Sequence, residues 1–506
     1  MESTINWIEN WNTPSPAGAA EGILYSSNPH CYRPRVKVRR YKLVSLVVVG
    51  TIAWSGVTIA GYADNTLKQA QTLTEQKRYQ EAISCLDQVL KQNPESAQAY
   101  VERARAYGNL GQNEKALSDV NKAIRLDPKL ALAYVTRAAA YGNLGQYQNE
   151  IDDANRAISL NPKLAMAYFR RGWAYDQLSQ YQNAMDDATK AISLDAKLER
   201  AYALRGRVYN QLMQYQNAVT DCTVAIGLNP KYPDTRANRG TAYLGQGQYE
   251  SAIADFTRAL SLDSKDAYVY ANRGAAYLGQ QQYEKAIDDF TRSLSLDPKA
   301  SYTYDNRGRA YSKLGRHQTA IDDFSKSIGL DPKDSYAFKS RGLSYSKLGQ
   351  HQKAIDDFSQ AIRLDPKDAW TYGNRGDTYR DLNQYQKAID DYSTAISLDL
   401  KNSYAYKVRG LTYNKLGQHQ KAIDDYSKAI SLNPGDAWPY QTRGDAYGDL
   451  SQYQKAIDDY SKAISLNPKF AWSYANRGRA YLKLRQYQKA IEDFSKAIWH
   501  AFSSGY

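Results

Sequence analysis

Cysteine and histidine, which build most metal and redox sites, are scarce in this sequence. Only three of the 506 residues are cysteines and five are histidines. Cys31, Cys85 and Cys222 lie in different regions, so no disulfide framework is indicated. A phosphate-binding glycine loop, a Cys/His cluster at metal-ligand spacing and a nucleophile with a matched base are all missing. We therefore predict a protein that is not an enzyme and that uses no cofactor and no metal.

Long uncharged apolar stretches are missing too, with one exception. Residues 43–62, LVSLVVVGTIAWSGVTIAGY, carry no charge and follow a basic stretch. A helix rising about 1.5 Å per residue over this length spans about 30 Å, the hydrocarbon thickness of a bilayer. The run predicts a single transmembrane helix that acts as a signal anchor. Because basic residues precede it, we expect a cytoplasmic N-terminus and extracytoplasmic repeats.

The same region allows a second interpretation. Gly61 and Ala63 are small residues where a signal peptidase would cleave, and cleavage would leave a secreted or periplasmic protein. Residues 1–42 have no periodic apolar pattern, which predicts a disordered basic tail.

Basic residues outnumber acidic ones without forming an evident patch. The net charge of +13 divides into +3 for residues 1–62 and +10 for the remainder. A nucleic-acid-binding protein is expected to gather its basic residues on one face. The thin spread of charge therefore predicts no nucleic-acid partner.

What the sequence has in abundance is a 34-residue repeat. Residues 267–300, AYVYANRGAAYLGQQQYEKAIDDFTRSLSLDPKA, represent it, and thirteen copies follow one another over 63–504 without insertion or loss. We call the positions of a repeat places 1 to 34, with Ala267 at place 1. Apolar residues at helical spacing in both halves predict two amphipathic helices, and the Asp-Pro near the end stops the second. Residues 505–506 form a short C-terminal end.

Single places of the repeat resemble those of the tetratricopeptide repeat family. These are a small residue at place 8, Tyr at place 11, Ala at place 20, an aromatic residue at place 24 and Pro at place 32. The resemblance, which extends to long membrane-anchored arrays of bacteria, implies an all-α, right-handed superhelical solenoid of thirteen helix-turn-helix repeats. Place 24 is smaller in the first five repeats and Glu150 takes place 20, so we expect looser packing there.

An opposite-charge pair recurs in twelve repeats, with Arg at place 7 and Asp at place 23. Repeat one lacks both, having Gln69 and Cys85 instead. This shared absence favours pairing within a repeat, which would lock the two helices together. The alternative is a row of arginines that binds an anionic ligand.

The resemblance implies that the first helices line a concave groove, and repeats six to thirteen carry a pattern along it. Place 2 is aromatic in the last seven repeats, place 6 is Asn in five, and basic repeats alternate with acidic ones. The asparagines resemble the peptide-holding ladder of the O-linked N-acetylglucosamine transferases, since an amide both donates and accepts. The predicted partner-binding residues are Asn238, Tyr268, Asn272, Tyr302, Asn306, Arg309, Lys313, Tyr336, Lys339, Lys347, Trp370, Asn374, Trp438, Trp472 and Asn476.

Together these patterns predict a membrane-anchored scaffold that binds an extended segment of a protein or peptide partner in the groove. Two alternatives stay open. One is a structural spacer that self-associates into a homo-oligomer. The other is a non-catalytic subunit of a cell-envelope or polysaccharide enzyme, with the aromatic row facing sugar rings.

Overall fold

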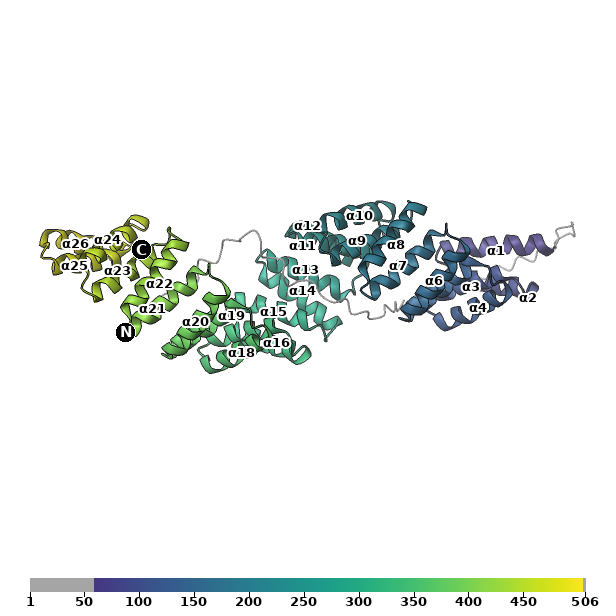
Figure 1. The fold of residues 1–506 in the computed structure, drawn as a ribbon. Coiled ribbons are helices and arrows are strands. Elements are labelled where there is room, and N and C mark those ends of the chain that lie inside the picture. Colours follow the sequence, from purple (N-terminus) through teal and green to yellow (C-terminus); the bar gives the residue numbers. More distant parts are fainter. Residues whose placement is uncertain (1–58, 504–506) are drawn as a thin grey trace. The chain divides into compact units, whose positions relative to one another are not determined.

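The computed structural model of the chain describes residues 59–503, which form 26 α-helices and no strand (Figure 1). Two helices make each repeat, so the predicted all-α array of thirteen repeats is confirmed. The chain divides into an N-terminal unit, residues 1–280, and a C-terminal unit, residues 281–506. Each unit is considered by itself.

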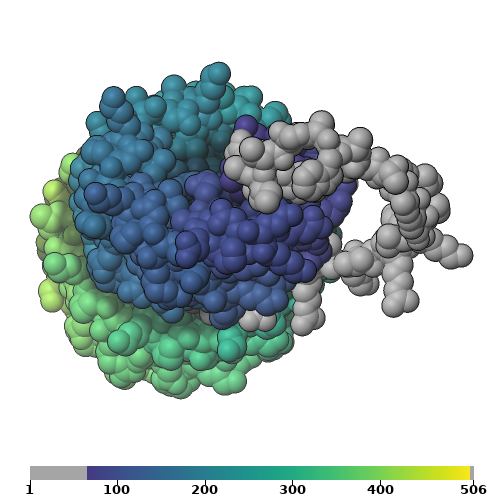
Figure 2. Space-filling view, turned by 90° about the vertical axis from the view of Figure 1, so that its right-hand side faces the viewer, coloured from purple at the N-terminus to yellow at the C-terminus, as the bar shows by residue number. Residues whose placement is uncertain are grey.

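The described part of the N-terminal unit holds thirteen helices, each packed against the next. Its surface is coloured purple to blue and teal in Figure 2. They are α1 (Ile59–Glu75), α2 (Tyr79–Gln92), α3 (Ala97–Asn109), α4 (Asn113–Leu126), α5 (Ala131–Asn143), α6 (Tyr147–Leu160), α7 (Ala165–Gln177), α8 (Tyr181–Leu194), α9 (Glu199–Gln211), α10 (Tyr215–Leu228), α11 (Pro233–Gly245), α12 (Tyr249–Leu262) and α13 (Ala267–Gly279).

The C-terminal unit continues the same alternation over its described residues. Its helices are α14 (Tyr283–Leu296), α15 (Ser301–Lys313), α16 (His317–Leu330), α17 (Ser335–Lys347), α18 (His351–Leu364), α19 (Ala369–Asp381), α20 (Tyr385–Leu398), α21 (Ser403–Lys415), α22 (His419–Leu432), α23 (Ala437–Asp449), α24 (Tyr453–Leu466), α25 (Ala471–Lys483) and α26 (Tyr487–Ser503).

The predicted membrane helix requires a correction. Within residues 59–503, no helix is both long and apolar enough to cross a bilayer. Helix α1 overlaps the predicted segment 43–62 only at its last four residues and continues as the first helix of repeat one, with the charged Asp64 and Lys68. The predictions of a transmembrane helix and of single-pass localisation are therefore wrong, because the helix formed at this end is a polar repeat helix. Residues 43–58, like the predicted disordered tail 1–42, lie outside the described residues.

The turn between the two helices of each repeat has one fixed backbone feature. Place 15 has a positive φ in all thirteen described turns, and glycine occupies it in only six. The others are Lys77, Ser179, Met213, Gln281, Asn383, Ser451 and Arg485. A side chain in this left-handed conformation is strained, because its Cβ crowds the following carbonyl oxygen.

Met213→Gly is expected to stabilise repeat five by about 1 kcal/mol, because glycine adopts φ 56° without steric cost. The Met213 side chain is 57% exposed, so little packing is lost. Thermal unfolding measures the gain. Gly417→Ala, at the same place with φ 71°, should shift the midpoint the opposite way. A destabilising Met213→Gly would contradict this account.

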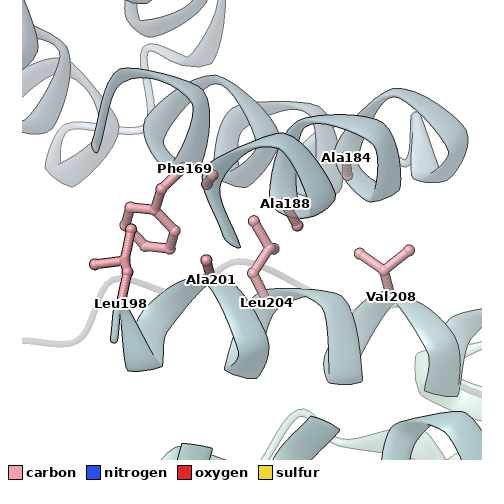
Figure 3. Packing of buried hydrophobic residues seen from close by; sticks show 8 residues of the cluster. Phe169, Ala184, Ala188, Leu198, Ala201, Leu204 and Val208 are labelled. Atoms are coloured by element: carbon pink, nitrogen blue, oxygen red, sulfur yellow. The ribbon is translucent and has the colours of Figure 1, made fainter. Parts of the chain in front are cut away.

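The core is built from small residues on one helix and larger ones on its neighbour. Figure 3 shows Leu204 and Val208 of α9 reaching toward Ala188 and Ala184 of α8. Leu204 is 2% exposed and both alanines are fully buried. The small residue at place 24 of repeat four is therefore compensated by a side chain of the next repeat, not by looser packing.

In the later repeats, the small residue and the large residue that packs against it belong to the same repeat. A Cβ added to Gly376 would lie 2.7 Å from the Tyr392 ring, so glycine at place 8 makes room for the aromatic at place 24. Tyr392 is fully buried.

The predicted ion pair within a repeat is confirmed in repeats two to six and eight to thirteen. There the Nε and Nη2 of the place 7 arginine donate to both oxygens of the place 23 aspartate over 2.6 to 2.9 Å. Such two-point pairing fixes direction as well as distance. The alternative, a row of arginines open to an anionic ligand, is not favoured by this geometry.

Each arginine also reaches the preceding repeat, which was not predicted. Its Nη1 donates to the residue at place 25 of that repeat, as in the 3.0 Å bond from Arg341 to Ser325 Oγ. The acceptor is Asp, Asn, Thr or Ser in all twelve cases. The arginine therefore joins the two helices of its own repeat and also joins neighbouring repeats.

Candidate partner-binding surface

The first helices of the repeats form the inner face of each unit. Within a unit, first helices of successive repeats contact one another, as α9 contacts α11 and α17 contacts α19, whereas second helices of successive repeats do not within the described residues. The stack is therefore tighter on the side of the first helices. Twelve of the predicted contact residues lie in the C-terminal unit, and three, Asn238, Tyr268 and Asn272, lie in the N-terminal unit.

The aromatic row at place 2 is accessible on this face. Tyr336 is 38% exposed, Tyr404 47% and Trp472 60% in the C-terminal unit, and Tyr268 is 47% exposed in the N-terminal unit. Tyr302, Trp370 and Trp438 are partly buried. Large aromatic side chains that stay accessible on an inner face offer anchoring contacts for a partner.

The asparagines at place 6 are less available than predicted. Asn272, Asn306 and Asn374 each donate from Nδ2 to the carbonyl oxygen four residues earlier in their own helix, over 2.8 to 3.0 Å. Asn476 donates instead to Asp445 Oδ1 at 2.7 Å. Asn272 and Asn306 are also buried. These amides therefore support the first helices, and only Asn238 has no side-chain bond of this kind among the described residues.

Most charges at places 5 and 9 are paired inside the protein. Lys339 Nζ donates to Asp368 Oδ2 at 3.0 Å and lies 5.0 Å from the Tyr336 ring centre and 5.6 Å from that of Trp370. Lys407 repeats the arrangement with Asp436 at 2.7 Å. Arg309 lies 5.2 Å from the Tyr336 ring centre and donates to Asn306 Oδ1 at 3.0 Å.

The acidic residues at place 9 are engaged as well. Asp377 accepts from the hydroxyls of Tyr392 and Tyr404, each at 2.8 Å, and pairs with Arg380 at 2.8 Å. Asp445 accepts from Tyr460 at 2.8 Å. The charges of Lys339, Lys407 and Asp377 are thus neutralised within the inner face, whereas Asp445 is held by hydrogen bonds alone.

Asp305 is an exception on this face. It is 5% exposed, and its Oδ1 has no hydrogen-bond partner among the described residues. Burial raises the pKa of its carboxyl to about 7, against the opposing charge of Arg309. Sequence analysis missed it, although an acid at place 5 beside basic repeats was a visible signal.

The N-terminal unit holds a second buried acid without hydrogen-bond partners among the described residues. Sequence analysis noted it only because it is larger than the small residue expected at place 20. Glu150 on α6 is fully buried, neither carboxyl oxygen has a hydrogen-bond partner among the described residues, and the nearest cation is Arg170 at 3.9 Å. A Cβ at Gly142 would overlap this carboxyl, so the absent side chain makes its space. Burial raises the pKa of Glu150 to about 8.

No described group of three or more His, Cys, Asp or Glu side chains could hold a metal ion. His317, His351 and His419 each begin a second helix beside the turn. Aromatic rings line the inner face of the described repeats.

Comparisons with known proteins agree with the repeat assignment. Models described as tetratricopeptide repeat or TPR repeat match residues 67–131, 131–164, 165–198, 199–232, 242–281, 267–300, 301–334, 335–368, 369–402, 403–436, 444–485 and 471–501. A comparison with curated proteins gave no match.

Two solved structures are similar in part. "Crystal structure of APC/C hetero-tetramer Cut9-Hcn1" is 18% identical, covers 88% of this chain and 94% of its own, and has a TM-score of 0.45. "Crystal structure of MamA" is 29% identical over 32% of this chain and 95% of its own, with a TM-score of 0.32. Likenesses with such TM-scores support no inference about function.

The family models cover most of the chain, and none of them describes a catalytic domain. Their repeats build scaffolds for protein–protein interaction. The predicted self-association and the predicted envelope role stay predictions. The chain belongs to the tetratricopeptide repeat family.

Proposed function

We propose that the protein binds an extended segment of a partner protein along the inner face of its C-terminal unit. The observation that carries the proposal is the row of accessible aromatic side chains at place 2, above all Tyr336, Tyr404 and Trp472. Aromatic anchors supply large contact areas at a low cost in side-chain entropy. Trp370 and Trp438 belong to the same row and are partly buried.

The polar residues of the face take a different role from the one predicted. Lys339, Lys407 and Asp377 are in ion pairs inside the protein, so their charges are compensated before a partner arrives. Asp445 is held by hydrogen bonds from Tyr460 and Asn476. A bound segment would gain little by breaking them, because each broken pair leaves a partly buried charge alone. Asn306 and Asn374 hold the backbone of the aromatic residues Tyr302 and Trp370, and Asn476 holds Asp445. The exposed Lys313 and Lys347 contact the segment.

Replacing Tyr336 and Trp472 together by alanine should abolish most partner capture while leaving thermal unfolding nearly unchanged, because both side chains are exposed. Full-length protein serves as bait, and captured proteins are quantified by mass spectrometry. The matched control replaces Leu330 and Leu398 by alanine. These exposed apolar residues, 44% and 40%, lie on the second helices α16 and α20. Identical captured proteins for both double variants would contradict the proposal.

A further inference from the structure

A row of exposed charges lies at place 13 of the first helices in the C-terminal unit. This place is the last residue of α15, α17, α19, α21, α23 and α25. It is occupied, from repeat eight to repeat thirteen, by Lys313, Lys347, Asp381, Lys415, Asp449 and Lys483, which we call the charged rim. All six residues are exposed.

In the described repeats of the N-terminal unit, place 13 is charged only in repeat one, where the exposed Glu75 ends α1. In repeats two to seven the same place holds Asn109, Asn143, Gln177, Gln211, Gly245 and Gly279, none of which is charged. At Gly245 the reason is steric, since an added Cβ would lie 2.5 Å from the Tyr215 ring. Six uncharged residues followed by six charged ones mark a change in what this edge contacts.

The local helix preference explains only part of the rim. A lysine at the last position of a helix is favourable because it faces the negative end of the helix dipole. An aspartate there is unfavourable by about 0.3 to 1 kcal/mol. Asp381 and Asp449 therefore oppose the preference of their own helices, which four lysines in the same row satisfy.

Internal pairing does not account for the two acids either. Asp381 lies 3.6 Å from Arg380, whose closer partner is Asp377 at 2.8 Å, and the Asp381 side chain is 46% exposed. Asp449 lies 3.5 Å from the His419 ring and its side chain is 53% exposed. Lys313, Lys347, Lys415 and Lys483 make no hydrogen bond or ion pair with the described residues. The rim keeps its order of signs open to solvent.

We propose that the charged rim reads the order of charges along the bound segment. The segment would carry acid, acid, base, acid, base and acid opposite repeats eight to thirteen. Contacting helices lie about 10 Å apart, and an extended chain rises about 3.3 Å per residue. Successive charges of the segment are therefore spaced about three residues apart. This inference rests on the proposed function and names the chemistry of its partner.

Three labelled peptides of about eighteen residues and identical composition test the order by fluorescence anisotropy with the full chain at low salt. One carries the complementary order, one carries it reversed to allow the opposite chain direction, and one places all acids before all bases. One of the first two should bind about tenfold more tightly than the third, since each exposed pair contributes only a small factor. Equal binding of all three, or none, would overturn the inference.

A charge reversal supplies the second arm. Asp381→Lys with Asp449→Lys makes the rim uniformly basic, and the preference should move to a peptide with six acids. The matched control, Asp390→Lys with Asp458→Lys, changes the net charge equally on exposed residues of the second helices α20 and α24. A similar shift in both double variants would mean that net charge, not order, is read. Peptides that bind without discriminating refute the inference, whereas capture unaffected by the Tyr336 and Trp472 changes refutes the proposed function.

Discussion

Glu150→Gln is expected to stabilise the protein at pH 9 by about 3 to 5 kcal/mol. Burial raises the pKa of the Glu150 carboxyl from 4.5 to about 8, despite the opposing charge of Arg170. At pH 9 the folded protein must keep an ionised carboxylate in a site where neither oxygen has a hydrogen-bond partner. Glutamine keeps the shape of the side chain and removes that charge.

The sign of the pH dependence follows from the same shift. Between pH 4.5 and about 8 the folded state holds a proton on Glu150 that the unfolded state has released. The stability contributed by this proton is complete below pH 4.5 and is lost as the pH rises to about 8. Glu150→Gln should therefore match the parent protein near pH 4.5 and exceed it increasingly up to pH 9.

Hydrogen exchange of α6 and α7 measures the effect where it arises, because a repeat array is stabilised mainly by nearest-neighbour contacts and need not unfold in one step. Glu114→Gln is the matched control, since Glu114 is exposed on α4. If Glu150→Gln protected α6 and α7 no better at pH 9 than at pH 5, the buried carboxylate would not be ionising as described.

The second large effect is expected at the arginine of place 7. Arg341→Met should destabilise repeats eight and nine by about 3 to 5 kcal/mol, because it leaves the Asp357 carboxylate without its two-point partner in a site where that side chain is 9% exposed. It also removes the 3.0 Å bond to Ser325, which belongs to the preceding repeat.

Two further variants separate these contributions. Ser325→Ala removes only the contact between repeats and should cost about 1 kcal/mol. Arg341→Met combined with Asp357→Leu should cost less than Arg341→Met alone, since no buried charge is left unpaired. Hydrogen exchange in α17 and α18 provides the measurement. Equal losses for Arg341→Met and Ser325→Ala would contradict a dominant role for the pair.

Of the two contacts of the place 7 arginine, the sequence predicted one and missed the other. Because Gln69 and Cys85 replace both partners in repeat one, the sequence indicated that Arg and Asp pair within a repeat, and they do. The contact with the preceding repeat was not visible. Place 25 varies among Asp, Asn, Thr and Ser, and only their shared acceptor oxygen matters to the arginine.

On the candidate surface, too, some features were predicted from the sequence and others were not. The family resemblance implied that aromatic residues at place 2 line the inner face, and Tyr336, Tyr404 and Trp472 are accessible. That Asn272 and Asn306 bond to their own helices did not follow, because a side chain four residues from a carbonyl can turn either inward or outward. The same holds for Lys339, whose partner Asp368 is the last residue of the same repeat, 29 residues away, and caps helix α19.

The membrane helix was predicted wrongly for a related reason. The prediction treated residues 43–62 as one apolar helix. Helix α1 instead covers Ile59–Glu75 and is the first helix of repeat one. A repeat helix needs only one apolar stripe and is polar elsewhere. Asp64 and Lys68 belong to the polar part of α1, although the prediction placed them after the end of the membrane helix.

By itself the sequence determined the 34-residue period, the two helices of each repeat and the residues that pack them, because these depend on spacings repeated thirteen times. Only the tertiary structure decided which polar groups remain available to a partner. Whether Lys339 or Asp377 is neutralised depends on how the side chains around it are placed, because a pair forms only where the two charged groups come within about 3 Å. The same packing leaves the charged rim exposed and the carboxyl of Glu150 buried.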